Sequence, residues 1–311
     1  MALYLVTGGA GFIGSHMVEE ILRRGDSVRV IDDLSTGSKD NLALVWDKVD
    51  FQEGDICSPE TLRQVMEGVD YVIHLAALSS VVRSVQDPVA TTQVNLVGTL
   101  QVLLAARDAH VQRVVMAATA AAYGESPTLP LVETQMPAPL SPYALVKLAG
   151  EYYGKIFYRL FQLEFVGLRY FNIFGPRQNP KSPYTGVLSK FITAYLDGRT
   201  PVIFGDGEQS RDFTYVANVV DASLRACAQP EAPGKSINVG TGIGTTLNQT
   251  IKLLNKILNV EVKPDYGPPR LGDVLHSRAD ISLARSVLGY EPIVDFEEGL
   301  RRTTEYLRTH R

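Results

Sequence analysis

Short apolar runs rich in β-branched residues alternate with helical stretches through the first half of the chain. The runs that we expect to form strands are residues 3–7, 27–32, 49–54, 70–76, 113–119 and 164–171. Alternation of this kind indicates repeated βαβ units, in which a parallel sheet is covered by helices on both faces. The pattern therefore predicts an α/β fold with a doubly wound parallel sheet.

Three helix starts carry a capping side chain followed by proline: Ser58-Pro59, Asp87-Pro88 and Ser141-Pro142. The helices expected at 88–110 and 142–161 are apolar over more of their circumference than a one-sided surface helix needs. We expect a second copy of the chain to cover this extra surface and predict a homodimer. Cover by neighbouring loops is the alternative.

Beyond residue 172 the alternation gives way to loops rich in Pro, Gly and Asn, such as residues 175–186 and 264–273. Loops on a rigid α/β scaffold commonly carry substrate specificity. A strand and helix near 211–228 and a strand near 235–239 are expected to rejoin the sheet. We predict a cofactor domain formed by 1–171 and 211–240, and a smaller α/β substrate domain formed by 172–210 and 241–311.

Composition limits the class of protein. The 311 residues are 45% hydrophobic and 21% charged, with a net charge of -4, which is typical of a globular chain and unfavourable for nucleic acid or anionic lipid. Only Cys57 and Cys227 are present, and no secretory signal or uninterrupted membrane-length apolar run is found. We therefore expect a cytoplasmic protein without nucleic-acid or membrane partners and without a metal.

A glycine-rich turn follows the first predicted strand. Residues 7–14 read TGGAGFIG and contain the spacing Gly9-x-Gly11-x-x-Gly14. Glycines at these positions permit a tight turn and close approach of the backbone to a pyrophosphate, which the following helix N-terminus attracts. The pattern alone is weak evidence, but its place between a strand and a helix indicates a Rossmann-type dinucleotide site.

The end of the second strand selects the dinucleotide. Asp32 lies 18 residues beyond Gly14, near the spacing at which an acid accepts hydrogen bonds from the adenosine ribose. A carboxylate there repels a 2'-phosphate, and residues 33–38 (DLSTGS) include no Arg or Lys. We predict NAD as the cofactor, with a turn cap as the alternative role of Asp32. The ends of later strands extend the site to Asp55, Ile56, Leu75, Ala76 and Ala77.

Tyr143 and Lys147 are four residues apart in the helix that starts at Ser141-Pro142, so both side chains share one face. A neighbouring cation favours the phenolate, and we expect it to lower the pKa of Tyr143 enough for general-base catalysis. Thr119, at the end of the fifth strand, is expected to share this crevice. The alternatives are a surface Tyr–Lys pair and a threonine that bonds only its own backbone.

With these residues in place, the chain resembles the extended short-chain dehydrogenase/reductases of the NAD-dependent epimerase/dehydratase family over nearly its whole length. The matching segments are TGGAGFIG, Asp32, Thr119 with Tyr123-Gly124, Tyr143-x-x-x-Lys147 and residues 168–172 (LRYFN). Residues 205–207 (GDG), 210–213 (SRDF) and Arg270-x-Gly272-Asp273 further resemble UDP-hexose 4-epimerases. The resemblance implies an isomerase that retains NAD.

The resemblance also implies a mechanism. Tyr143 takes the proton of the sugar 4-hydroxyl while hydride passes from C4 to the nicotinamide, and the 4-keto sugar then turns and receives the hydride on its other face. Lys147 lowers the pKa of Tyr143 and holds the nicotinamide ribose. The implied cofactor site comprises Gly8, Gly11, Phe12, Ile13, Gly14, Asp32, Asp33, Ser35, Thr36, Gly37, Asp55, Ile56, Leu75, Ala76, Ala77, Asn95, Tyr143, Lys147 and Tyr170. The implied substrate site comprises Ser80, Thr119, Tyr143, Asn172, Val187, Leu188, Phe204, Arg211, Arg270, Asp273 and Ser277.

Two details bear on the substrate. Thr119 is followed by three alanines, whereas dehydratases and decarboxylases of the family usually carry an acid there, so redox-neutral epimerisation is favoured. Ser277 stands where epimerases restricted to UDP-glucose have a bulky Tyr, which implies room for a 2-acetamido group. We predict turnover of UDP-N-acetylglucosamine and UDP-glucose. A UDP-glucose-restricted epimerase and a non-catalytic NAD-sensing protein are the alternatives.

Overall fold

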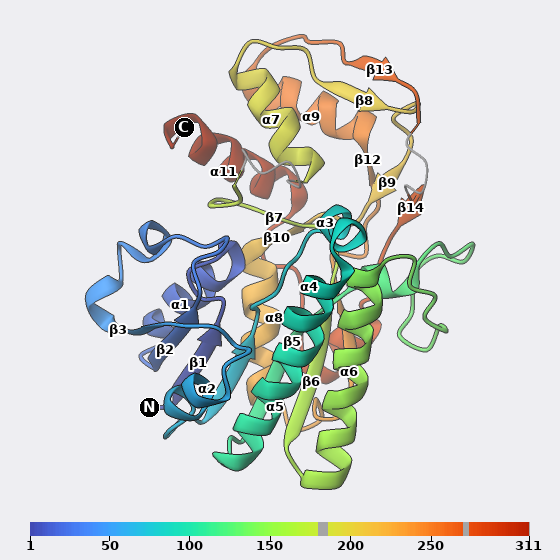
Figure 1. Ribbon diagram of the computed structural model, residues 1–311. Helices are drawn as coiled ribbons and strands as arrows, with labels where there is room; N and C mark the ends of the chain where they lie inside the picture. The colour runs from blue at the N-terminus through green and yellow to red at the C-terminus, as the bar shows by residue number, and fades with distance from the viewer. Residues whose placement is uncertain (180–185, 270–273, 311) are drawn as a thin grey trace.

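The computed structural model describes residues 1–179, 186–269 and 274–310, and a seven-stranded parallel sheet lies at its centre (Figure 1). The strand order is β11-β6-β5-β4-β1-β2-β3. These strands are β1 (Leu3–Thr7), β2 (Ser27–Asp32), β3 (Val49–Glu53), β4 (Tyr71–His74), β5 (Arg113–Thr119), β6 (Glu164–Tyr170) and β11 (Ser236–Val239). The order reverses between β1 and β4, the position at which open α/β sheets bind ligands.

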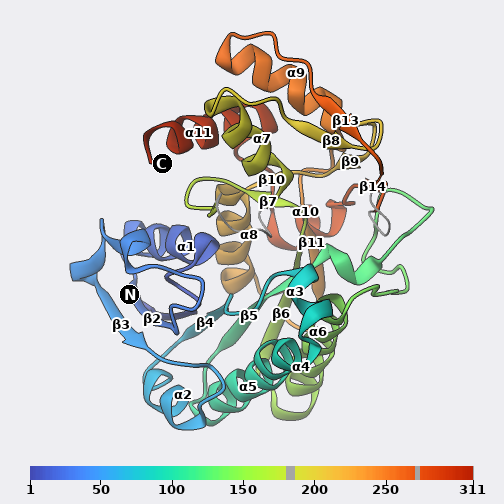
Figure 2. The same ribbon diagram turned by 45° about the horizontal axis from the view of Figure 1, so that its top comes forward.

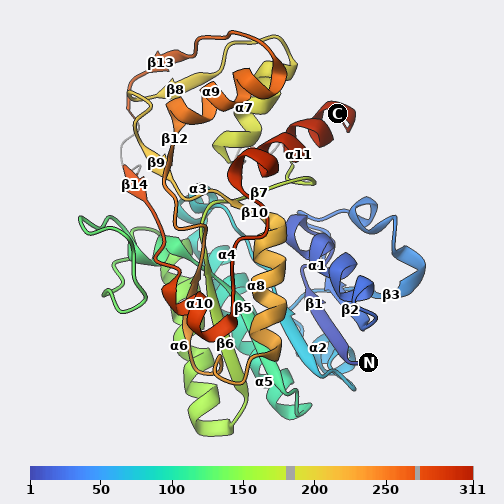
Figure 3. The same ribbon diagram turned by 180° about the vertical axis from the view of Figure 1, so that it is seen from behind.

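Helices cover both faces of the sheet, as Figures 1 and 3 show. One face carries α2 (Pro59–Val65), α5 (Thr99–Asp108) and α6 (Pro142–Phe161), and the other carries α1 (Phe12–Arg23), α8 (Val216–Ala228) and α10 (Ser282–Leu288). Every residue of β5 is buried, as a strand covered on both sides requires. The predicted Rossmann-type doubly wound fold is confirmed.

The expected strands β1, β2 and β5 have the predicted bounds, and the others differ by one or two residues at their ends. The single helix expected at 88–110 is divided into α4 (Pro88–Thr92), a π-helical segment Gln93–Gly98 and α5. Within the π-helical segment the Asn95 amide accepts from Leu78 N at 2.8 Å and donates to Leu78 O at 2.9 Å. This side chain joins the widened turn to the loop that follows β4.

The expectation that the segment near 211 rejoins the main sheet is wrong for its strand. β10 (Thr214–Tyr215) pairs with β7 (Ile173–Phe174) in a separate two-stranded sheet, because Thr214 N donates to the carbonyl oxygen of Asn172 above the main sheet. α8 nevertheless packs on β5 and β6, and β11 pairs with β6. The domain boundaries drawn from the sequence stay a prediction.

The remaining elements gather beyond the carboxyl ends of the strands, which Figure 2 brings forward. They are α3 (Val81–Gln86), α7 (Val187–Leu196), β8 (Val202–Phe204), β9 (Ser210–Arg211), β12 (Thr245–Thr246), α9 (Leu247–Leu258), β13 (Asp265–Gly267), β14 (His276–Ser277) and α11 (Phe296–Thr309). An aromatic cluster joins α11 to this layer: the Phe296 ring stacks on Phe213 with centroids 5.3 Å apart and lies 5.5 Å from Phe174.

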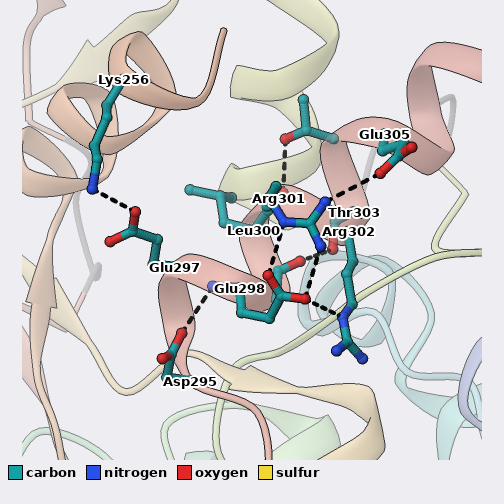
Figure 4. Close-up of polar contacts among 11 residues, drawn as sticks. Lys256, Asp295, Glu297, Glu298, Leu300, Arg301, Arg302, Thr303 and Glu305 are labelled. Carbon is teal, nitrogen blue, oxygen red and sulfur yellow. Dashed lines mark hydrogen bonds and ion pairs between the residues drawn. The ribbon is translucent and has the colours of Figure 1, made fainter.

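Charged side chains form ion pairs along α11 (Figure 4). Asp295 caps the helix by accepting from Glu298 N, and the Glu298 carboxylate bonds both Arg301 and Arg302. A 2.6 Å ion pair between Lys256 and Glu297 reaches across to α9. Exposed pairs of this kind contribute little each to stability, so α11 is held mainly by its apolar packing, which includes Phe296, Leu300 and Leu307.

Among the described residues, one helical segment, Pro88–Asp108, is long and apolar enough to cross a membrane by length and composition, and 39% of it is buried within the structure. It lies beside α2 and α6 on the sheet.

Candidate functional site

The glycine-rich turn between β1 and α1 forms a backbone cradle. Gly8 has φ +72°, and a Cβ atom there would lie 2.8 Å from Ala76 N. A Cβ on Gly14 would lie 2.1 Å from the carbonyl oxygen of Gly8, so the helix approaches the turn this closely only because residue 14 is glycine. The N-cap residue Gly11 offers no side-chain cap, which leaves the first N–H groups of α1 available to an anion.

Asp32 closes this cradle from the end of β2. It is 7% exposed, and its two carboxylate oxygens accept hydrogen bonds from Ala10 N and Leu34 N, each at 2.9 Å. Burial raises the pKa of Asp32, while these two bonds oppose the shift. The turn-cap role is therefore present, and since each oxygen has a second lone pair, ribose hydroxyls can also be accepted.

A cleft at the topological switch point runs from the glycine turn past the ends of β2, β3 and β4. Of the predicted cofactor residues it is lined by Gly8, Gly11, Phe12, Ile13, Gly14, Asp32, Asp33, Ser35, Thr36, Asp55, Ile56, Leu75, Ala76 and Ala77. Its described lining includes no Lys or Arg, as expected for a site that takes NAD without a 2'-phosphate. The residues present fit the dinucleotide.

The other predicted cofactor residues lie outside this lining. Gly37 is beside it, because a Cβ there would lie 3.1 Å from an Asp32 carboxylate oxygen. The Asn95 side chain accepts a hydrogen bond from the backbone N–H of Leu78. The Tyr170 hydroxyl forms a 2.8 Å hydrogen bond with the Ser223 hydroxyl on the α8 side of the sheet. Direct contact of NAD with these residues stays a prediction.

Thr119 and Tyr143 meet near the carboxyl end of β5. The Thr119 hydroxyl hydrogen bonds to the Tyr143 phenol and also accepts from Ala121 N at 3.1 Å. The threonine thus caps its own backbone, as the alternative interpretation proposed, and still reaches the tyrosine. Burial raises the pKa of Tyr143, and the bond from Thr119 works in the opposite direction.

Lys147 is 3% exposed, and its ammonium donates a 2.8 Å hydrogen bond to the carbonyl oxygen of Ala117. Burial lowers the pKa of Lys147 to about 8, while the charge of Glu151 opposes this. The expectation that the pKa of Tyr143 is lowered is wrong for this structure, because burial raises it.

A second cavity, of about 570 Å³, lies between α7 and the short strands above the sheet. Of the predicted substrate residues it is lined by Asn172, Val187, Leu188, Phe204 and Arg211. Ser277 is next to it: it is 9% exposed and pairs in register with Arg211 across β14 and β9. Ser80 caps α3 by accepting from Arg83 N at 3.0 Å. Arg270 and Asp273 lie outside the described residues.

Several residues of this cavity were missed by sequence reasoning, among them Lys190, Arg199 and Gln209. Lys190 could have been found, since it follows Val187 by three residues on α7. The Oε1 atom of Gln209 is buried without a hydrogen-bond partner, although its Nε2 atom donates to Phe204 O. Within the described parts of the chain, no cluster of His, Cys, Asp or Glu could hold a metal ion.

Together, a dinucleotide cleft, a Tyr–Lys–Thr group and a second cavity lined by an arginine are typical of a nicotinamide-dependent enzyme on a Rossmann-type fold. The sequence model of the "NAD dependent epimerase/dehydratase family" matches residues 4–240. The chain belongs to this family, and the resemblance inferred from its motifs, including NAD as cofactor, is confirmed.

Similar proteins were found by sequence and by structure. The chain is 42% identical over 308 residues to a UDP-glucose 4-epimerase of Mycolicibacterium smegmatis, covering 98% of both chains. Its structure is similar to a UDP-N-acetylglucosamine 4-epimerase from Methanobrevibacter ruminantium M1 in complex with UDP-N-acetylmuramic acid (TM-score 0.95, 38% identity, 100% and 99% coverage). It is also similar to a Thermus thermophilus UDP-glucose 4-epimerase in complex with NAD (TM-score 0.89, 37% identity, 99% and 100% coverage).

Proposed function

We propose that this protein interconverts UDP-N-acetylglucosamine with UDP-N-acetylgalactosamine, and UDP-glucose with UDP-galactose, by epimerisation at C4. The enzyme class, an NAD-dependent UDP-sugar 4-epimerase and therefore an isomerase, follows from family membership and from the relatives named above. The acetylated substrates are the finer part of the proposal.

Three features of this chain would hold NAD in the cleft. The uncapped start of α1 would bind the pyrophosphate, Asp32 would accept hydrogen bonds from the adenosine ribose, and residues at the ends of β3 and β4 would line the adenine side. The cofactor, when bound, supplies the hydride acceptor and donor for the sugar C4. The protein contributes position and electrostatics.

Proton transfer is assigned to Tyr143. To act as a base its phenol has to lose a proton in a buried site, and a hydrogen bond from Thr119 favours the phenolate. The Lys147 ammonium lies on the same helix face and adds a positive charge, and its bond to Ala117 O fixes its direction. The Tyr143 phenolate takes the proton of the 4-hydroxyl and returns it when the epimer forms.

The observation that best supports an acetylated substrate is the small Ser277 side chain beside Arg211. Arg211 faces the cavity with a charge suited to a diphosphate, and its Nη1 atom is steadied by Ser210 O and Leu275 O. The register of β14 places Ser277 directly opposite Arg211. A serine there leaves volume for a 2-acetamido group, and this extra room rejects a smaller sugar only weakly.

The test is to incubate the purified protein separately with UDP-N-acetylglucosamine and UDP-glucose, without added NAD, and to follow the 4-epimers by NMR. Turnover of both is expected. Ser277→Tyr should abolish turnover of the acetylated sugar and retain turnover of UDP-glucose. Wild-type protein that converts UDP-glucose and never UDP-N-acetylglucosamine would contradict the proposal and favour the UDP-glucose-restricted alternative. Turnover of neither, with NAD added, would favour a dehydratase, a decarboxylase or an NAD-sensing protein.

The proposal includes a homodimer through α3–α6, which lie together on one side of the molecule (Figure 1). This side exposes large apolar residues, with Val89 78%, Leu160 69% and Ile156 46% exposed. A surface of this kind is typical of a subunit contact. Sedimentation should give twice the chain mass, and Leu160→Glu should shift it to the monomer.

The cytoplasmic location and the absence of nucleic-acid and membrane partners stay predictions. The net charge of -4 supports the predicted absence of nucleic-acid and anionic-membrane partners.

A further inference from the structure

A buried ion pair lies one helical turn beyond Lys147 on α6. The carboxylate of Glu151 accepts hydrogen bonds from Arg169 at 2.9 to 3.2 Å and from the Ser236 hydroxyl at 2.6 Å. Glu151 is 1% exposed and Arg169 is 3% exposed. Burying two charges costs several kcal/mol per ion, and apolar residues of similar volume are often as stable. Stability alone is therefore a weak explanation of the pair.

Glu151 acts on Lys147 through its charge. Tyr143, Lys147 and Glu151 are spaced by four residues along α6 and share one face. Glu151 is the carboxylate whose charge favours the Lys147 ammonium. Among the described residues, Tyr143 shares this helix face, and His74 on β4 also faces Lys147; burial keeps the His74 ring neutral by lowering its pKa to about 3. His74 is bonded on both nitrogens, to Thr7 at 2.8 Å and Thr99 at 2.9 Å.

Arg169 also contacts the turn that follows Thr119. Its guanidinium lies over the ring of Tyr123, 4.8 Å from the centroid, and the Tyr123 hydroxyl donates to Asn238 at 2.7 Å. Tyr123 ends the 3₁₀ turn Ala120–Tyr123, which Thr119 caps. On β6, Arg169 is the register partner of Ala118, the residue before Thr119. The pair thus connects α6 with the turn that follows Thr119.

We infer that Glu151 and Arg169 are a positioning pair for the proposed epimerase reaction. Glu151 keeps Lys147 charged, and Arg169 fixes the turn beside Thr119 against α6. Neither residue lines the NAD cleft or the substrate cavity, so their effect passes through Lys147 and Thr119. The kinetic consequences rest on the proposed function, whereas the charge state of Lys147 can be measured without turnover.

Two variants separate positioning from a purely structural role. Glu151→Gln removes the carboxylate and keeps its shape, but leaves Arg169 buried without its partner. Glu151→Gln/Arg169→Met removes both charges and is expected to fold, since no unpaired charge remains. The matched control is Glu164→Gln, which breaks the 2.6 Å pair with buried Arg113 at the opposite end of β6.

The first readout is an NMR titration of the protein labelled with ¹³C at lysine Cε, with the Lys147 signal assigned by its loss in Lys147→Arg. In Glu151→Gln the Lys147 midpoint should fall by about one pH unit, because the favourable charge is gone. In the double variant the fall should be smaller but still resolved, because removal of the Arg169 cation offsets part of it. The second readout is turnover: kcat should fall at least about tenfold while KM stays within about threefold, and the alkaline limb of kcat should move to lower pH. Glu164→Gln should leave the midpoint and kcat at wild-type values.

The proposal would be overturned by a wild-type Lys147 midpoint in the double variant, or by recovery of wild-type kcat there, because either result would mean that only the unpaired Arg169 mattered. An equal shift in Glu164→Gln would overturn it as well. If Glu151→Gln does not fold, the double variant decides. A wild-type protein that turns over no UDP-sugar would count against the proposed function, and the NMR titration would still decide whether Glu151 keeps Lys147 charged.

Discussion

The ammonium of Lys147 donates a 2.8 Å hydrogen bond to the carbonyl oxygen of Ala117, so helix α6 is joined to the central strand β5 by a buried cation. Burial lowers the pKa of this group from 10.5 to about 8. The ammonium is thus the charged form at neutral pH, but it is easily lost in mildly alkaline solution.

Activity and stability should respond to alkaline pH in opposite directions. Turnover should fall as pH rises through about 8, since the ammonium is then lost. Between pH 8 and 10.5 the unfolded chain binds the proton that the folded chain has released, so this group makes the free energy of unfolding rise with pH, by up to about 3 kcal/mol.

Denaturant unfolding at pH 7, 8, 9 and 10, beside a pH profile of kcat, checks this prediction. Lys147→Met serves as the control, because it removes the titrating group and should flatten this part of the stability profile. A wild-type free energy of unfolding that changes with pH just as it does in Lys147→Met would show that the pKa of Lys147 is not lowered.

Two glycines one turn apart on α6 should respond differently to alanine. A Cβ on Gly154 would lie 2.3 Å from the Phe165 ring, whereas a Cβ on Gly150 would lie 3.2 Å from the flexible end of Met116 and in ordinary contact with Thr99 at 3.5 Å. Gly154→Ala should therefore cost about 1 to 3 kcal/mol by overpacking. Gly150→Ala should be neutral or stabilising by up to about 1 kcal/mol through helix propensity. Urea unfolding measures both, and equal effects would contradict the packing argument.

Asp32 should decide which dinucleotide is retained. Asp32→Asn removes the charge that repels a 2'-phosphate and turns one oxygen into an amide donor facing either Ala10 N or Leu34 N. Purified variant should carry less NAD, and its preference for NAD over NADP should fall by about tenfold. Bound dinucleotide is measured by chromatography after denaturation. Asp50→Asn, which changes an exposed carboxylate paired with Arg29, is the control. Wild-type protein that binds NADP as tightly as NAD would refute the assigned role of Asp32.

The sequence predicted those parts of the molecule whose determinants lie within one short segment. The strand β1, the glycine turn and the Tyr143-x-x-x-Lys147 spacing each depend on a few consecutive residues, and all were found. The buried bonds from Arg169 and Ser236 to Glu151 join residues 18 and 85 positions apart, and local periodicity holds no signal for them. The pKa of Tyr143 was misjudged for the same reason, since burial by distant elements sets it.

The residues proposed to bind the substrate show the same limit of prediction from local sequence. Arg211 and Ser277 were recognised singly, but their register across β9 and β14 comes only from the fold. The strand near 211 was expected in the main sheet because its β-rich sequence carries no information about its partner. β10 pairs with β7 instead, since the chain has already left the main sheet at Asn172.

Asp212, next to Arg211, joins three segments of the chain through buried hydrogen bonds. It is fully buried, and one oxygen accepts from the Thr241 backbone and hydroxyl at 2.7 and 2.6 Å. The other oxygen accepts from Gly242 N at 2.9 Å and from Ala279 N at 3.1 Å, two residues beyond Ser277. This one carboxylate therefore joins the segments that carry Arg211 and Ser277.

Asp212→Asn should disturb both segments. The amide nitrogen would face two N–H or O–H donors, which should cost about 2 to 4 kcal/mol of stability and raise KM for UDP-sugars several-fold by displacing Arg211. Asp295→Asn is the matched control: Asp295 caps α11 by accepting from Glu298 N, and asparagine caps a helix equally well, so neither stability nor KM should change. Calorimetry and initial-rate kinetics on both variants check this. An Asp212→Asn protein as stable as wild type, with an unchanged KM, would mean that these segments are held by their other contacts.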